Sequence, residues 1–179
     1  MTIETPRLLL RPWREADKPE YARIINTPAM MEHFGGPQRA EVHDALLDRM
    51  MAAQERNGHC MWAVEERATG SLAGICGVRI GGHENTPVPE VLEIGWRIAE
   101  PWWGRGVARE AAEASLAWSW ANTDRPFVAA WTSPGNARSW GLMLRLGMVR
   151  RPERDFRHPL YAEDDPLGQM VVYTIDRPA

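Results

Sequence analysis

The chain has few of the features that mark secreted, membrane or nucleic-acid-binding proteins. Only two of its 179 residues are cysteines, and Cys60 and Cys76 stand apart within apolar runs, so we expect buried, reduced thiols. No signal-like amino terminus and no apolar run near the roughly 18 residues of a membrane span is present. A formal charge of −3 gives no strong field for nucleic acid or an anionic bilayer. We therefore expect a cytoplasmic protein with no membrane or nucleic-acid partner.

The composition is that of one folded domain. Hydrophobic residues make up 44% of the chain and charged residues 25%, which suits one globular domain with a full core over residues 1–179. The five histidines have no spacing typical of metal ligands, so no metal site is expected.

The first half of the sequence predicts an antiparallel meander preceded by helices. Expected strands cover residues 7–13, 60–67, 72–80 and 91–98. Asp17 and Pro19 give a start signal for a helix through Ile25. A second helix is expected from one apolar face that contains a single arginine, formed by Val42, Ala45, Leu46, Arg49, Met50 and Ala53.

The second half changes to alternating helix and strand. A helix from about Arg105 to Ala121 connects the strand ending at Ile98 to a strand over 127–131, which makes one βαβ unit. A further helix begins at Asn136 and ends near Leu146, with Gly147 beyond its end. Its expected buried face holds Trp140, Met143 and Leu144. Strands over 148–156 and 169–175 complete a mixed α/β domain.

The junction of strand and helix between Glu93 and Glu110 carries the clearest chemical signal. An apolar strand runs into a turn with Gly104 and Gly106, which opens a helix. The first helical turn has backbone N–H groups without partners and about half a positive charge, so it stabilises a bound anion. Because the two glycines lack a Cβ atom, a ligand can approach the main chain closely. The junction therefore predicts a phosphate site.

Four segments resemble the GNAT superfamily of acyl-CoA-dependent N-acetyltransferases, and within it the RimJ/RimL-like branch, which acetylates ribosomal-protein amino termini. They are Thr5-Pro-Arg-Leu-Leu-Leu-Arg11, Trp62-Ala-Val-Glu with Gly74-Ile-Cys-Gly77, Glu93-Ile-Gly-Trp with Trp103-Gly-Arg-Gly-Val-Ala-Arg-Glu-Ala111, and Asn136-Ala-Arg-Ser139. The resemblance implies a predominantly antiparallel sheet of six to seven strands with about four helices, splayed at the strand that ends near Ile98.

The same resemblance implies acetyl-CoA as co-substrate. Backbone amides at the glycine turn would hold its pyrophosphate, and the strand near Ile98 would pair with pantetheine. The implied cofactor-binding residues are Arg97, Ile98, Trp103, Gly104, Arg105, Gly106, Val107, Ala108, Arg109, Asn136 and Ser139. The implied acceptor is a primary amine, of a small molecule or a protein amino terminus, and the chain would act as a monomer or homodimer.

Two residues are candidates for catalysis. Glu93 can take the amine proton, directly or through water, although a structural ion pair is the competing interpretation. Ser139 can donate a hydrogen bond to the leaving thiolate, or instead bond its own helix backbone. Asn136 likewise is a pantetheine contact, an N-cap, or both. The sequence departs from the superfamily at Met143, where many members place a tyrosine proton donor.

Two other functions fit parts of the pattern. A non-catalytic acyl-CoA sensor on the same scaffold is compatible with Met143. A dinucleotide-binding oxidoreductase is suggested by Gly104 and Gly106, but a third glycine at the expected spacing and a parallel first half are both missing. We also expect Trp13, Trp96 and Trp102 to be available as walls of an acceptor pocket.

Overall fold

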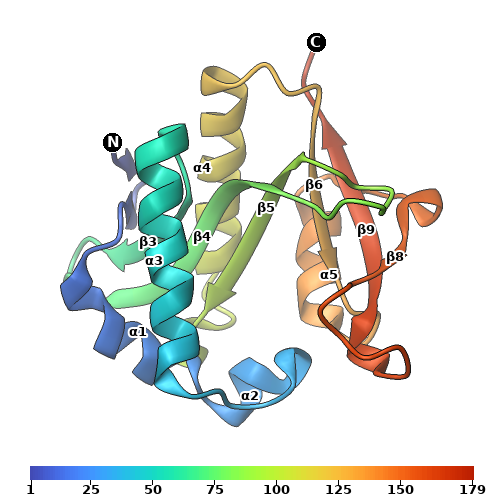
Figure 1. Cartoon of the computed structure of the whole chain (residues 1–179). Helices are drawn as coiled ribbons and strands as arrows, with labels where there is room; N and C mark the ends of the chain where they lie inside the picture. Colours follow the sequence, from blue (N-terminus) through green and yellow to red (C-terminus); the bar gives the residue numbers. More distant parts are fainter.

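A computed structural model describes residues 1–179, and one nine-stranded sheet forms its centre (Figure 1). The strands follow the order β1-β2-β3-β4-β5-β6-β9-β7, with β8 beside β9. Their bounds are Ile3–Glu4 (β1), Leu8–Arg11 (β2), Met61–Glu66 (β3), Leu72–Gly81 (β4), Val91–Ile98 (β5), Phe127–Thr132 (β6), Val149–Arg150 (β7), Phe156–Arg157 (β8) and Gln169–Asp176 (β9). The predicted fold class is confirmed, and β1, β7 and β8, with two residues each, account for the strands beyond the six to seven expected.

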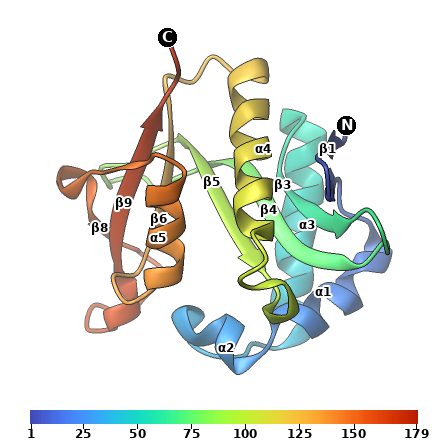
Figure 2. The same cartoon turned by 180° about the vertical axis from the view of Figure 1, so that it is seen from behind.

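Helices cover both faces of the sheet. The five α-helices are Lys18–Ile25 (α1), Pro28–Met31 (α2), Ala40–Asn57 (α3), Val107–Asn122 (α4) and Ala137–Arg145 (α5). The view in Figure 1 has α1 and α3 in front of the sheet, and the reverse view in Figure 2 has α4 and α5 in front. The four-residue helix α2, which no sequence pattern predicted, begins at the Thr27 N-cap with Pro28 in its first turn. None of these helices has the length and apolarity needed to cross a bilayer.

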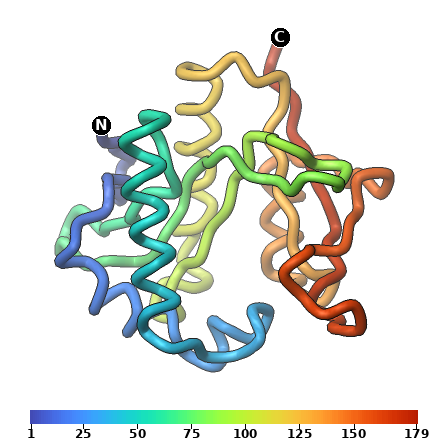
Figure 3. The backbone as a smooth tube through the Cα atoms, viewed as in Figure 1, coloured from blue at the N-terminus to red at the C-terminus, as the bar shows by residue number.

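The strands β5 and β6 form the only parallel pair and separate from one another. Every other neighbouring pair is antiparallel, whereas β5 and β6 are bridged at a single register position, Glu93 with Ala129. The two strands diverge beyond that position, as the tube in Figure 3 shows. This topology excludes the parallel half-domain of a dinucleotide-binding oxidoreductase.

The core confirms most of the expected packing and corrects part of it. Trp62 is fully buried and meets Trp118 of α4 edge to face, with ring centroids 5.1 Å apart. Cys60 and Cys76 are buried, unpaired thiols, and burial raises the pKa of each to about 12. Trp13 does not wall a pocket, because it is buried in the core and its indole donates to the Met61 carbonyl at 2.8 Å.

Three local expectations were wrong. Residues 148–156 do not form one strand, because a 3₁₀ turn at Pro152–Arg154 separates β7 from β8. Leu144 of α5 is 52% exposed and does not join Met143 in the core. In α3 the buried residues are His43, Leu47 and Met50, and of the predicted face only Leu46, Met50 and Ala53 pack on the core, whereas Val42, Ala45 and Arg49 are exposed.

Candidate active site

An open bend lies before α4, at the position where the sequence predicts a phosphate site. Gly104 and Gly106 have φ values of +70° and +77°, in the left-handed region that L side chains rarely adopt. Gly106 is the N-cap of α4, and no side chain caps the first turn of that helix. A Cβ atom on Gly104 would meet no atom within 4 Å, so space lies open beside the bend. The bend therefore fits a diphosphate bound through main-chain amides.

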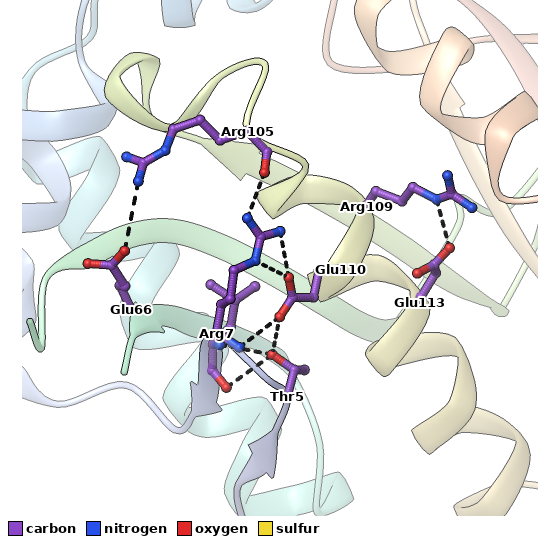
Figure 4. A network of polar contacts seen from close by, with 8 residues as sticks. Thr5, Arg7, Glu66, Arg105, Arg109, Glu110 and Glu113 are labelled. Carbon is purple, nitrogen blue, oxygen red and sulfur yellow. Dashed lines mark hydrogen bonds and ion pairs between the residues drawn. The ribbon is translucent and has the colours of Figure 1, made fainter. Parts of the chain in front are cut away.

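A polar network from the amino terminus holds this bend against the sheet (Figure 4). Glu110, in the first turn of α4, accepts hydrogen bonds from Thr5 Oγ1 at 2.5 Å, Arg7 N at 3.0 Å and Arg7 Nε at 2.6 Å. Arg7 Nη1 also donates to the carbonyl of Arg105 at 2.8 Å. Burial alone would raise the pKa of Glu110, but these hydrogen bonds outweigh it and lower the pKa. Sequence reasoning did not assign this role to Thr5 or Arg7, because they lie about 100 residues away along the chain.

The side chains around the bend divide into paired and unpaired cations. Arg109 Nε lies 2.8 Å from Glu113 Oε1, and Arg105 Nη2 lies 3.9 Å from Glu66 Oε1, so both have acidic neighbours within the chain (Figure 4). Arg138 of α5 has no acidic partner and lies over the ring of Trp103, 4.2 Å from its centroid. The indole of Trp103 in turn donates to the Ile98 carbonyl at 2.5 Å. Trp103 thus joins the end of β5 to the start of α5.

The open edge of β5 exposes main-chain groups between the two diverging strands. The Ala99 N–H donates a hydrogen bond to the carbonyl of Ala73 in β4, at 2.9 Å. Because alternate residues of a strand point their N–H and C=O groups to opposite sides, those of Arg97 also face β4. The groups of Trp96 and Ile98 face the divergence instead. The main-chain groups of Trp96 and the Ile98 N–H, rather than the groups of Arg97, are available to an extended ligand there, because the Ile98 carbonyl already accepts from Trp103.

Glu93 lies at the single bridge between β5 and β6, where the strands begin to separate. It is 8% exposed, and its Oε2 lies 2.8 Å from Arg79 Nη2 without hydrogen-bond alignment. Burial raises the pKa of the Glu93 carboxyl, and Arg79 opposes that shift. A Cβ atom at Gly81 would stand 2.2 Å from Glu93 Oε2, so glycine leaves room for the carboxylate. The geometry is therefore compatible with both interpretations of Glu93 that the sequence left open, a structural ion pair and a base with a raised pKa.

The start of α5 presents two polar side chains. Asn136 is the N-cap, as predicted, and its Oδ1 accepts from the Ser139 N–H at 3.2 Å. The Ser139 hydroxyl is partly exposed and makes no hydrogen bond within the chain. Met143 is 1% exposed and packs in the core, so this helix has no proton donor at the position of the superfamily tyrosine.

A cavity of about 260 Å³ lies on the other face of the sheet, close to the low end of volumes typical for ligand pockets. Its walls come from α2 and the turn after it, from α3, from Arg97 of β5 and from the loop at Leu160 and Tyr161. The α3 residues Val42, Leu46 and Arg49, which belong to the predicted apolar face, line this cavity. Neither Trp96 nor Trp102 lines it. His43, which sequence reasoning passed over, does.

The site therefore has two sides joined by one strand. The bend before α4 and the start of α5 lie on the face covered by α4 and α5 (Figure 2), and Trp103 of the bend contacts Arg138 of α5. Arg97 and the cavity lie on the face covered by α1 and α3, and β5 runs between the two. No group of three or more His, Cys, Asp or Glu side chains is arranged to hold a metal ion.

This arrangement is that of an acetyltransferase, and the chain belongs to the Acetyltransferase (GNAT) domain family, which matches residues 7–149. It is an acetyl-CoA-dependent N-acetyltransferase. The Bacillus subtilis protein YkkB, itself uncharacterized, is 28% identical over 147 residues, or 82% of this chain and 84% of that protein.

Solved structures agree with the family assignment. An acetyltransferase from Agrobacterium tumefaciens is 28% identical, with a TM-score of 0.78 over 98% of this chain and 94% of its own. RimL, a ribosomal-protein alpha-N-acetyltransferase solved in complex with coenzyme A, has a TM-score of 0.76 over 98% of each chain. At 15% identity, the similarity to RimL shows a shared fold alone.

Proposed function

We propose that the protein transfers the acetyl group of acetyl-CoA to a primary amine by direct attack within a ternary complex. The observation that carries this proposal is the pair of separate openings that meet at β5, the uncapped bend on one face and the cavity on the other. Two substrates can then be bound together, with neither passing through the other's site. No acyl-enzyme is required.

In the proposed reaction the amine nitrogen attacks the thioester carbonyl carbon, and a C–N bond forms as the carbonyl π electrons move to oxygen. An N–H group of the open β5 edge, from Trp96 or Ile98, stabilises that oxygen. When the carbonyl forms again, the C–S bond breaks and coenzyme A leaves as a thiolate. The Ser139 hydroxyl, free of partners within the chain, donates a hydrogen bond to the thiolate. With a thiol pKa near 8.5, this leaving group needs only modest help.

Glu93 is the proposed base that removes the amine proton. A protein α-amine of pKa about 7.8 costs roughly 1 kcal/mol to neutralise at pH 7, whereas a lysine-like amine of pKa about 10.4 costs roughly 4.6 kcal/mol. Burial raises the pKa of Glu93 toward the range where a carboxylate is an effective base. A protein N-terminal α-amine is therefore the acceptor class that demands least of this site.

The proposal is tested by acetyl-CoA consumption with α-amino peptides, lysine peptides, polyamines and aminoglycosides, with mass spectrometry of the products. Direct transfer predicts intersecting double-reciprocal lines, because both substrates must be bound before reaction. Parallel lines, the ping-pong pattern, contradict the ternary complex. Binding of acetyl-CoA without consumption across the whole panel supports a sensor instead.

The role of Glu93 is tested by comparing Glu93→Gln with Arg79→Gln. If Glu93 is the base, Glu93→Gln lowers kcat by about 100-fold or more and removes the rise of kcat with pH that belongs to the carboxyl group. Arg79→Gln removes the cation that opposes burial, so it shifts that rise to higher pH. Equal losses in both variants, with unchanged pH profiles, would show that the ion pair is only structural.

A further inference from the structure

The polar lining of the cavity consists of hydrogen-bond donors and cations, with no acidic side chain. Arg97 and Arg49 line it together with His43 and Gln38. Arg97 forms no ion pair within the chain, and its guanidinium lies over the ring of Phe34, 3.9 Å from the centroid. Ten of the 20 arginines of the chain have carboxylate partners, as Arg7, Arg11 and Arg79 do. Neither Arg49 nor Arg97 forms an ion pair, and the charge of Arg97 acts only at longer range on the buried Glu93 of the same strand.

Two buried polar atoms next to Arg97 also lack partners. His43 is 2% exposed and lines the cavity, and its Nε2 makes no hydrogen bond. Tyr21 is fully buried, and its hydroxyl lies near enough to Arg97 for the guanidinium to oppose the rise that burial causes in the pKa of Tyr21, although the geometry falls short of a well-aligned hydrogen bond. Burial, and then the charge of Arg97, lowers the pKa of His43, so the ring is neutral at pH 7 and retains one N–H donor. Each unsatisfied buried group costs about 1–3 kcal/mol unless a ligand completes it.

We propose, resting on the proposed function, that this cavity binds a carboxylate group of the acceptor. The substrate class is then a primary amine that carries a carboxylate. Arg97 supplies a planar fork suited to a carboxylate, and the unpaired His43 nitrogen supplies a further donor. Two sources share this chemistry: the α-carboxylate of a free amino acid, and an acidic side chain near the amino terminus of a peptide.

The position of Arg97 connects this anchor to the reaction. Its neighbours Trp96 and Ile98 have main-chain groups at the open edge of β5, whereas the Arg97 side chain enters the cavity from the same strand. Glu93 and Arg97 lie four residues apart, so their side chains share one face of the sheet. A carboxylate held by Arg97 therefore places the attached amine on the face of the proposed base and beside the proposed thioester site.

The acidic run at residues 163–165 does not neutralise these cations. The Asp165 carboxylate is occupied as a cap, because it accepts from the Leu167 N–H at 2.9 Å. Arg157 fixes the same loop by donating to the carbonyls of Ala162 and Asp165, each at 2.6 Å. Tyr161, on this loop, is thereby held at the cavity wall.

The transfer experiment compares acceptors that differ only in one charged group. The first pair is a free amino acid and its carboxamide. The second pair is two peptides of otherwise identical sequence, one with Asp and one with Asn as the second residue. We expect kcat/KM to be at least ten-fold higher for the carboxylate member of at least one pair, which identifies the source. In Arg97→Gln that ratio falls to near one. Arg56→Gln, at an exposed arginine of α3 outside the cavity lining, is the matched control and keeps the ratio.

A second variant tests the unpaired imidazole. His43→Leu replaces the ring with an apolar side chain of similar volume, so we expect a lower carboxylate-to-carboxamide ratio with a melting temperature equal to or above that of the wild type. A lower melting temperature with an unchanged ratio would assign His43 a structural role and remove it from the anchor.

A binding experiment separates this proposal from the proposed function. Calorimetry in the presence of coenzyme A measures the Kd of an N-acetyl amino acid and of an N-acetyl peptide with Asp as its second residue. Each Kd is compared with that of the uncharged counterpart, the carboxamide or the Asn peptide. Tighter binding of a carboxylate that Arg97→Gln abolishes supports the anchor even if no amine is acetylated. Equal binding of charged and uncharged ligands, or carboxamides preferred in both experiments, overturns it.

Discussion

Replacing Gly104 with alanine is the sharpest test of the bend. Its φ of +70° puts an alanine in the left-handed region, which costs about 1–2 kcal/mol. No atom lies within 4 Å of the new Cβ, so the free protein gains no steric clash. At this chain length each kcal/mol lowers the melting temperature by about 2–4 °C. We therefore expect a small loss of stability and a folded variant.

The effect on coenzyme A should be larger. A methyl group at the bend occupies space beside the main-chain amides and displaces a bound phosphate from at least one of them. Loss of one charge-assisted hydrogen bond costs about 1.5–3 kcal/mol, which corresponds to roughly a 10-fold to 100-fold rise in Kd. Isothermal titration calorimetry with coenzyme A measures that Kd directly.

Gly70→Ala provides a matched control in the hairpin between β3 and β4. Gly70 has a φ of +71°, and a Cβ atom added there would also meet no atom within 4 Å, so its backbone strain equals that at Gly104. Both variants should lose the same stability, and only Gly104→Ala should lose coenzyme A affinity. The reasoning is refuted if the two variants bind coenzyme A with equal Kd, because the bend would then not hold the diphosphate.

Three further predictions concern the network, the leaving group and acid stability. Glu110→Gln should cost about 1 kcal/mol of unfolding free energy and weaken coenzyme A binding, whereas Glu113→Gln, at an exposed helix pair, should change stability by less than about 0.5 kcal/mol in urea titrations. Ser139→Ala should lower kcat more than coenzyme A affinity, and a loss of affinity alone in steady-state and calorimetric data would make Ser139 a binding residue. Burial, His83 and Arg79 lower the pKa of His158 to about 4. The free energy of unfolding is therefore unaffected by His158 above about pH 6.5 and decreases as the pH drops below that value, because the unfolded chain binds a proton at His158 that the folded chain does not bind. At 1.36 kcal/mol per pKa unit the loss of unfolding free energy has an upper bound near 3 kcal/mol, which solvent around the half-buried ring reduces to about 1–2 kcal/mol. His158→Gln should make the decline in melting temperature between pH 7 and 4 shallower, and an identical decline in the variant and the wild type would refute this role of His158.

The sequence predicted the elements whose signals are local. Alternation and turn residues located β3, β4 and β5, and the Asn136 N-cap with Gly147 beyond the last turn located α5. The glycine bend was predictable for the same reason, because the positive φ at Gly104 and Gly106 is a property of a few consecutive residues. These signals require no knowledge of how distant segments meet.

The parts that were missed depend on contacts between distant segments. The periodicity of α3 was recognised, but the apolar residues Val42 and Leu46 line a cavity together with His43, a polar residue that is buried. Periodicity reports that a face is apolar, and it does not report whether side chains or a ligand will cover it. The Thr5, Arg7 and Glu110 network and the approach of Arg79 to Glu93 likewise arise only when strands and helices assemble.

The two sides of the site use different chemical groups, and this difference has a consequence for specificity. On the side of α4, the proposed contacts are main-chain amides at Gly104, Gly106 and the first helical turn, which depend on backbone shape and tolerate many side chains. On the cavity side, the proposed recognition depends on individual side chains such as Arg97 and His43, which line the cavity. Substitutions in the cavity can therefore change the acceptor while coenzyme A binding is retained. The acceptor preference of this chain should accordingly be sought in the residues of the cavity and not in those of the bend.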